Sequence, residues 1–318
     1  MTDDKKPADL IVYDDEALAR YSFGDNHPFG PARFNAFYQR FTELGLDQLV
    51  AHGQAKQATD EQILLFHTED YIEHVKKHSA TGEGYLDYGD TPAFKGIYEA
   101  ASTVVGTTLD AIDKMMAGNF KRAFIPIAGL HHARRDKAAG FCALNDCGVA
   151  IEYLRHQYNI KNIAYVDIDA HHGDGVYYSF ESDPDLFFAD IHEDGIYLYP
   201  GTGHMNETGS GAALGTKLNL PVAMNADDAQ FDKQWKKIED YLIQRQPEFI
   251  LLQCGADSID GDPITHLKFS EHSHAKAASR LKEIANDYCN GKLLVMGGGG
   301  YDLDNIAKTW NAVVTALI

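Results

Sequence analysis

The chain has little cysteine and no long hydrophobic run. Its 318 residues include only four cysteines, none of them in CxxC spacing. So few thiols argue against a disulfide-stabilised secreted protein or a cysteine zinc site, and they indicate reduced thiols in the cytoplasm. No run approaches the roughly 18 apolar residues of a membrane span. The polar start Met1–Lys6 has no apolar segment behind it, so we expect no signal peptide.

Positive charge is also scarce. Lys and Arg number 28 against 47 Asp and Glu, a net charge of −19. Nucleic-acid affinity depends largely on Lys and Arg, so the balance argues against a nucleic-acid partner. It suits a cationic substrate, or simply solubility. No Pro/Ser-rich linker, charge block or repeat divides the chain, and we expect a single domain, residues 1–318.

Short apolar runs alternate with amphipathic stretches along the chain. The runs expected to be strands are Asp9–Tyr13, Ala123–Ile127, Ile163–Ile168, Leu186–Ile191, Phe249–Gln253 and Leu293–Met296. The stretches expected to be helices are Phe34–Leu44, Asp60–His78, Ala93–Met116, Asn145–His156, Gln230–Arg245 and Ser270–Cys289. Near-continuous apolar strands separated by helices predict an α/β protein with a parallel sheet covered on both faces.

Carboxylates and imidazoles gather in the segment Asp167–Gly175, directly after the apolar run Ile163–Val166. If the segment is extended, its side chains alternate between two sides: Asp167, Asp169 and His171 on one, His172 and Asp174 on the other. Asp169 and His171 can then offer oxygen and nitrogen to one metal ion, a ligand mix that Zn²⁺ accepts. A solvated acidic turn is the alternative interpretation, but it explains so many titratable groups at a strand end poorly.

Polar groups follow four of the expected strands. The four strand ends lead to His131-His132, to the Asp167–Gly175 segment, to Asp257 and to the run Gly297–Tyr301. Ligands of parallel sheets bind beyond the carboxyl ends of the strands, so we expect one shared pocket. Alone, Asp257 could equally cap a helix, and Tyr301 could be a core phenol. The glycine run could be a flexible loop or an anion nest. It lacks GxGxxG spacing and we expect no helix cap after it, which argues against a dinucleotide site.

Six segments carry a resemblance to a known family. They are His131–Arg134, Gly140–Asp146, Asp167–Gly175, Tyr199–Gly203, Gly255–Asp257 with Gly261–Pro263, and Gly297–Tyr301; Phe66–Tyr71 and His27–Phe29 extend the match. Their order resembles the zinc-dependent histone deacetylases, and among these the bacterial acetoin-utilization type. The resemblance covers nearly the whole chain. It implies a three-layer α/β/α fold with a central, mostly parallel eight-stranded sheet, the arginase/deacetylase fold.

The same resemblance implies a metal-dependent amidohydrolase that removes acetyl or short acyl groups from lysine side chains. Asp169, His171 and Asp257 look like the ligands of Zn²⁺, or of Fe²⁺, with a fourth position left open as catalytic zinc requires. Such an ion can polarise an amide carbonyl and lower the pKa of its water. The expected substrates are acetylated lysines in proteins or peptides, or small acetylated amines.

The resemblance also assigns catalytic roles. His132 would be the general base that takes the water proton and later protonates the leaving amine, with His131 as its electrostatic partner. Asp167 would orient His131, and Asp174 would orient His132. Tyr301 would donate its phenol proton to the developing oxyanion.

A narrow substrate channel is implied as well. The residues that match the family's substrate-binding positions are Asp90, Gly140, Phe141, Tyr199, Ile264 and Gly299. Phe141 and Tyr199 would grip the aliphatic stem, and Asp90 at the rim would accept hydrogen bonds from the substrate backbone. Arg33 and Leu130 match an inner channel for released acetate.

A structural potassium ion is implied beside the metal. Its expected ligands are Asp167, Asp169, His171, Asp190 and Ile191. Three positions depart from the usual pattern. Asp190 replaces a serine, which should strengthen cation binding, and Leu130 replaces a larger aromatic residue, which should widen the inner cavity. Tyr199 stands where phenylalanine is common. These departures bear on substrate range and leave the metal ligands intact.

Three alternatives remain at this point. An arginase-type ureohydrolase needs further carboxylates where this chain has Gly173 and Ile259. A non-catalytic protein that binds acetylated ligands would not need all of Asp169, His171, Asp257 and Tyr301, which are present. An acetylpolyamine amidohydrolase suits the acidic charge, whereas Asp90 favours acetyl-lysine.

Overall fold

The computed structural model describes residues 9–318, so the expectation about the chain start lies outside the described residues. Eight parallel strands form one sheet in the order β2-β1-β3-β8-β7-β4-β5-β6. The strands are β1 (Leu10–Val12), β2 (Ala51–His52), β3 (Arg122–Ile125), β4 (Ile163–Asp167), β5 (Leu186–Glu193), β6 (Lys217–Val222), β7 (Phe249–Gln253) and β8 (Leu293–Met296). The predicted α/β class and eight-stranded sheet are confirmed, and the sheet is parallel throughout.

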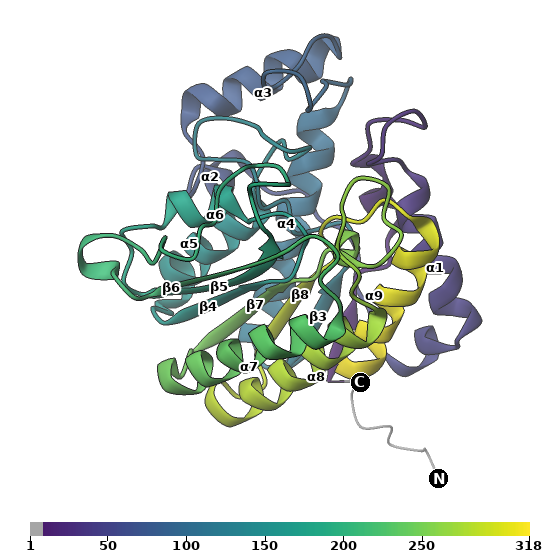
Figure 1. Ribbon diagram of the computed structural model, residues 1–318. Helices are drawn as coiled ribbons and strands as arrows, with labels where there is room; N and C mark the ends of the chain where they lie inside the picture. Colours follow the sequence, from purple (N-terminus) through teal and green to yellow (C-terminus); the bar gives the residue numbers. More distant parts are fainter. Residues whose placement is uncertain (1–8) are drawn as a thin grey trace.

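Helices cover both faces of the sheet (Figure 1). They are α1 (Ala32–Glu43), α2 (Asp60–Ile63), α3 (Glu69–Thr81), α4 (Ile97–Met116), α5 (Asp146–Tyr158), α6 (Asp174–Ser179), α7 (Asp228–Arg245), α8 (Glu271–Tyr288) and α9 (Leu303–Leu317). In one layer α8 packs on α7 and α9, and α9 packs on α1. In the other, α4 packs on α3 and α5. Among the described residues, no helix is long and apolar enough to cross a membrane.

The central strands are buried because helices cover them on both sides. Every residue of β3, β4, β5, β7 and β8 is buried, which explains their near-continuous apolar sequences. Four of these strands, β3, β8, β7 and β4, are neighbours in the sheet. Since all run in the same direction, their carboxyl ends meet at one edge, and the polar segments that follow them are brought together.

Several elements differ from the sequence-based expectation. The two-residue strand β2 is too short to show a pattern, and β6 was hidden by Lys217, Asn219 and Pro221, which an edge strand tolerates. The helix expected over Asp60–His78 is two helices, α2 and α3. The expectation of no helix cap after the glycine run was wrong: Asp302 accepts a hydrogen bond from the Asn305 N–H and begins α9.

Candidate active site and metal centre

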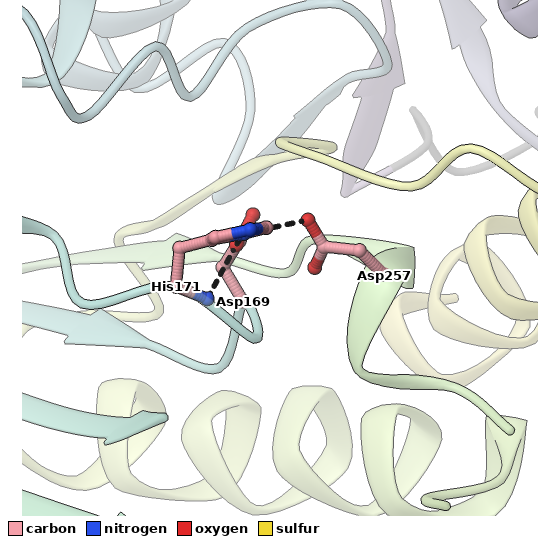
Figure 2. Close-up of side chains that lie close together, drawn as sticks. All are labelled: Asp169, His171 and Asp257. Carbon is pink, nitrogen blue, oxygen red and sulfur yellow. Dashed lines mark hydrogen bonds and ion pairs between the residues drawn. The ribbon is translucent and has the colours of Figure 1, made fainter. Parts of the chain in front are cut away.

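Asp169, His171 and Asp257 lie together, buried, beyond the ends of β4 and β7 (Figure 2). Their candidate ligand atoms all lie within 4.8 Å of one another. His171 Nδ1 is 3.0 Å from Asp169 Oδ1 and 3.2 Å from Asp257 Oδ2. The structure therefore brings two carboxylates and one imidazole, separated by up to 88 positions in the sequence, to a single point.

The surroundings of these side chains fit a divalent cation. Asp257 Oδ1 accepts a hydrogen bond from the Ala170 N–H, whereas its buried Oδ2 has, among residues 9–318, the ion-pair contact with His171 Nδ1 at 3.2 Å but no hydrogen bond. Burial lowers the pKa of His171, but Asp169 and Asp257 outweigh burial and raise this pKa to about 10. The negative charge of Asp169 and Asp257 thus favours a positive charge between them. In the absence of a metal ion the protonated His171 supplies it, and a divalent cation bound to the same carboxylates would supply it instead.

Backbone and amide donors hold the Asp169 carboxylate in place. Its Oδ2 accepts from Gln253 Nε2 at 2.8 Å and from the Gly299 N–H at 3.0 Å. A Cβ on Gly299 would lie 2.1 Å from Asp257 Oδ2, so glycine is required for this close approach. Gly298 and Gly300 have φ values of +72° and +118°, which favour glycine. The glycine run therefore supports the carboxylates, with the Gly299 N–H bound to Asp169.

A pair of histidines lies beside the Asp169–His171–Asp257 cluster. His131 Nδ1 is 2.8 Å from Asp167 Oδ2, His132 Nδ1 is 2.7 Å from Asp174 Oδ1, and the two Nε2 atoms are 3.0 Å apart. All four side chains are buried. Each histidine thus contacts the carboxylate that the family resemblance assigns to it.

The two histidines differ in charge. Burial lowers the pKa of His131, but Asp167 and Asp169 outweigh it and raise this pKa to about 9. Burial and the charge of His131 together lower the pKa of His132 to about 4, against the opposing effect of Asp174. At neutral pH one ring of the pair is therefore cationic and its neighbour is neutral.

The expected alternation along Asp167–Gly175 was wrong. Strand β4 ends at Asp167, and the chain then turns into α6, of which Asp174 is the first residue. Asp174 therefore reaches His132 and also accepts a hydrogen bond from Arg134 Nη2 at 3.1 Å. Nδ1 of His172 instead lies 2.8 Å from Thr202 Oγ1, and His172 is not part of the candidate ligand cluster.

Tyr301 follows the glycine run and is half-buried beside the same centre. Its backbone N–H donates to Asp262 Oδ2 at 2.8 Å, and its ring lies 6.0 Å from the ring of Phe141. Burial, with the charge of Asp257, raises the pKa of its phenol well above 10. The hydroxyl is therefore protonated throughout the neutral range.

Two hollows flank these side chains. An inner cavity of about 20 Å³ is lined by residues that include Leu130, His132, Gly140, His171, Gly299 and Tyr301. Its volume holds about one water molecule, and the wider inner cavity expected from Leu130 stays a prediction. Phe29, Cys142 and Gln253 also line this inner cavity. Outside, a hollow of about 700 Å³ is lined by Asp90, Arg134, Lys137 and Tyr199, among others.

The remaining channel residues take different places. The ring of Tyr199 lies 5.2 Å from that of His132 and is 43% exposed, at the mouth. Ile264 lines neither hollow, and its backbone N–H donates to Asp262. Arg33 is buried behind the glycine run, where Nε donates to the Gly300 carbonyl and Nη2 to the Gly298 carbonyl.

Asp190 is fully engaged with protein partners. Its Oδ1 lies 2.7 Å from His192 Nδ1, and its Oδ2 accepts from the Gly173 N–H at 2.9 Å. His192 Nε2 faces the Gly203 carbonyl oxygen at 2.9 Å. Because both ring nitrogens face acceptors, both carry protons and His192 is an imidazolium. It neutralises Asp190, which argues against the stronger cation binding expected from this carboxylate; the potassium site with Ile191 stays a prediction.

Sequence reasoning missed several supporting residues. Tyr165 donates its hydroxyl to Asp167 Oδ2 at 2.7 Å, and Gln253 holds Asp169. Both are polar groups within otherwise apolar strands, which is the signal that could have revealed them. His192 carries the same signal, since it lies two residues after Asp190 in the buried strand β5. Asp262 carries no such local signal, because the Tyr301 N–H that it accepts from lies in another loop.

A fully parallel, helix-covered sheet with a buried Asp–His–Asp group at its carboxyl edge defines the arginase/deacetylase class. The model of the family "Histone deacetylase domain" matches residues 27–317, and the chain belongs to this family. The predicted family and fold are thereby confirmed.

Named relatives agree with this assignment. The acetoin utilization protein AcuC of Bacillus subtilis (strain 168) is 38% identical over 299 residues, covering 91% of this chain and 77% of the relative. AcuC of Staphylococcus aureus (strain MSSA476) is 34% identical over 320 residues, and the match covers 96% of this chain and 81% of that relative. The crystal structure of the HDA15 HD domain superposes with a TM-score of 0.90 at 26% identity, covering 98% of this chain and 88% of that one.

Proposed function

We propose that this chain is a zinc-dependent amidohydrolase that removes acetyl or short acyl groups from lysine side chains of cytoplasmic proteins or peptides, with residues 1–318 as one catalytic domain. The observation that carries the proposal is the meeting of three groups around one cavity. These are the Asp–His–Asp cluster, the charge-differentiated pair His131 and His132, and the phenol of Tyr301. Together they are the parts that metal-assisted amide hydrolysis needs.

Asp169, His171 and Asp257 are the residues that would hold the ion, Zn²⁺ or Fe²⁺. When bound there, the ion polarises the amide carbonyl and lowers the pKa of water. The chain's own contribution is to fix the donor set: Gln253 and Gly299 orient Asp169, and the Ala170 N–H orients Asp257.

His132 is the proposed general base. Its low pKa keeps it neutral, and Asp174 holds its Nδ1–H, so that Nε2 is the nitrogen that exchanges protons. It takes a proton from the attacking water and later returns a proton to the lysine nitrogen as the C–N bond breaks. His131, held as an imidazolium by Asp167, stabilises the negative charge that develops beside it.

Tyr301 is the proposed donor to the oxyanion. Its raised pKa keeps the hydroxyl protonated, and the hydrogen bond from its backbone N–H to Asp262 fixes the backbone at Tyr301. Phe141 and Tyr199 would line the path of the aliphatic stem, and Asp90 would bind the substrate backbone at the mouth.

The mouth favours a peptide over a polyamine. The outer hollow shares His74, Leu86 and Lys137 with a second hollow of about 480 Å³, so the two adjoin and together offer more length than a short amine needs. One of its carboxylates is already engaged by the protein: Asp87 Oδ1 accepts three backbone N–H groups. Burial and Asp87 raise the pKa of Asp90 to about 6. Small acetylated amines remain the second candidate because of the net charge of −19.

One side-by-side assay tests the proposal. Purified protein is given an acetyl-lysine peptide and an N-acetylated polyamine at equal concentrations, and released acetate is measured. We expect the peptide to give the higher kcat/KM. Faster hydrolysis of the polyamine would select the second candidate, and binding of either ligand without hydrolysis would show a non-catalytic protein.

A further inference from the structure

Phe141 has an unusual backbone conformation for its residue type. Five non-glycine residues among those described have positive φ, and four of them are Asn or Gln. Phe141, at φ +64°, is the exception. A bulky side chain in this region is strained and persists only where its surroundings hold it. Phe141 is the second central residue of a turn closed by the Cys142 N–H, which donates to the Ala139 carbonyl at 2.9 Å. The Phe141 N–H and carbonyl, in the peptide groups on either side, are not part of this hydrogen bond and need partners of their own.

Two side chains from distant parts of the chain hold these peptide groups. The Phe141 N–H donates to Thr91 Oγ1 at 3.1 Å, and the Phe141 carbonyl accepts from the Tyr21 hydroxyl at 2.7 Å. The Tyr21 oxygen in turn accepts from the Ala143 N–H at 2.8 Å. Thr91 and Tyr21 are both almost completely buried, so water does not substitute for either hydroxyl.

Thr91 also connects Phe141 to the rim. Its hydroxyl accepts from Phe141 and donates to Asp90 Oδ1 at 3.1 Å, which uses its single proton. The Thr91 N–H donates to Asp87 Oδ1 at 3.0 Å, and the Leu86 N–H donates to the Thr91 carbonyl at 2.9 Å. Thr91 is thus held by backbone hydrogen bonds to Leu86 and Asp87, while its hydroxyl holds the Phe141 N–H.

We propose that Thr91 and Tyr21 are positioning residues that clamp Phe141 in its left-handed conformation, and that Thr91 couples the rim carboxylate Asp90 to the channel wall. The proposal rests on the proposed function, in which Asp90 binds the substrate backbone and Phe141 packs on the acyl-lysine stem. Neither Thr91 nor Tyr21 touches the reacting atoms. The clamp therefore acts on substrate binding and not on the chemical step.

The test compares Thr91→Val, which removes the hydroxyl at nearly constant shape, with Thr91→Ser, which keeps it. Thr309→Val is the matched control, because the Thr309 hydroxyl is buried without a hydrogen-bond partner among the described residues. For an acetyl-lysine peptide we expect Thr91→Val to raise KM about tenfold and to change kcat less than about twofold. Thr91→Ser restores KM, and Thr309→Val leaves it unchanged. An unchanged KM in Thr91→Val, or an equal loss in Thr309→Val, overturns the proposal.

Coupling through Asp90 is tested in an Asp90→Ala background. There, Thr91→Val should raise KM by less than in the wild type, since one of its two partners is gone. An equal increase in KM in both backgrounds would show that Thr91 is not coupled to Asp90.

A crystal structure of Thr91→Val gives a readout that does not depend on activity: the Phe141 N–H should lose its partner, and the backbone and ring of Phe141 should shift from their wild-type positions. If Thr91→Val fails to fold, Tyr21→Phe tests the same clamp from the carbonyl side. If the wild type hydrolyses no acyl-lysine substrate, the proposed function fails, and the variant structures alone decide whether the clamp exists.

Discussion

Tyr301→Phe is the substitution that separates the oxyanion donor from the metal centre. It deletes one hydroxyl and keeps the ring, whose packing against Phe141 and Arg33 needs no oxygen. The backbone hydrogen bond from Tyr301 to Asp262 is also kept. The variant should therefore fold as the wild type does and should keep its metal, because the phenol lies outside the Asp169–His171–Asp257 set.

The expected loss is in kcat. Removal of one preorganised oxyanion donor costs about 10²–10³ in kcat, or about 2.7–4 kcal/mol of transition-state stabilisation. KM should change little, since the hydroxyl acts on charge that develops in the transition state. Because the Tyr301 phenol stays protonated well above pH 10, its loss should lower the pH–rate profile without changing the profile's shape at neutral pH.

Steady-state kinetics on an acetyl-lysine peptide, with zinc content measured on the same preparation, would test this. Wild-type kcat in Tyr301→Phe would refute the assigned role and leave the hydroxyl as a core feature. A loss of bound metal together with activity would place Tyr301 in support of the metal centre instead.

Three further predictions follow from the same contacts. Tyr199→Ala should raise KM more than it lowers kcat, because it removes packing shared by the ground and transition states; a collapsed kcat at constant KM would contradict this. The Asp190–His192 pair raises the pKa of His192 above 6.5 against the effect of burial, so its stabilisation is full below pH 6.5 and is lost as pH rises through the folded pKa. The difference in unfolding free energy between wild type and His192→Gln should therefore shrink on the alkaline side, and a pH-independent difference would refute the charged pair. Lys137 is exposed and lines the outer hollow, where it could pair with an acidic residue of the substrate. Lys137→Glu should therefore lower kcat/KM about twofold to fivefold for peptides with an acidic residue beside the acetyl-lysine and raise it for basic ones, as expected for an exposed ion pair. Equal changes for both peptides would exclude a contact between Lys137 and the substrate.

Much of the fold could be predicted from the sequence because burial determines the pattern of the central strands. Strands β3, β4, β5, β7 and β8 have near-continuous apolar runs, and each was expected close to its observed place. Strand β6 lies at the edge of the sheet, where polar residues and a proline are tolerated, so its sequence gave no clear pattern. Helix α9 was missed although Asp302 provides an ordinary N-cap signal.

The site was predicted where its residues follow strand ends, and missed where contacts join distant loops. Asp169, His171 and Asp257 stand directly after β4 and β7, and parallel strands bring those ends together. The link from Thr91 to Phe141 spans 50 positions between two loops, and no periodicity encodes it. The size of the inner cavity could not be inferred from Leu130 alone, because Gln253 and other residues from distant parts of the chain also line it.

Metal dependence is the central claim, and zinc titration of the metal-free protein tests it most directly. Binding is measured by calorimetry, and acetate release from an acetyl-lysine peptide is followed in the same samples. We predict that the metal-free protein is inactive, that about one ion binds per chain and restores activity, and that Asp257→Asn loses both tight binding and activity. Full activity in protein shown to be metal-free, or wild-type zinc affinity in Asp257→Asn, would contradict the account.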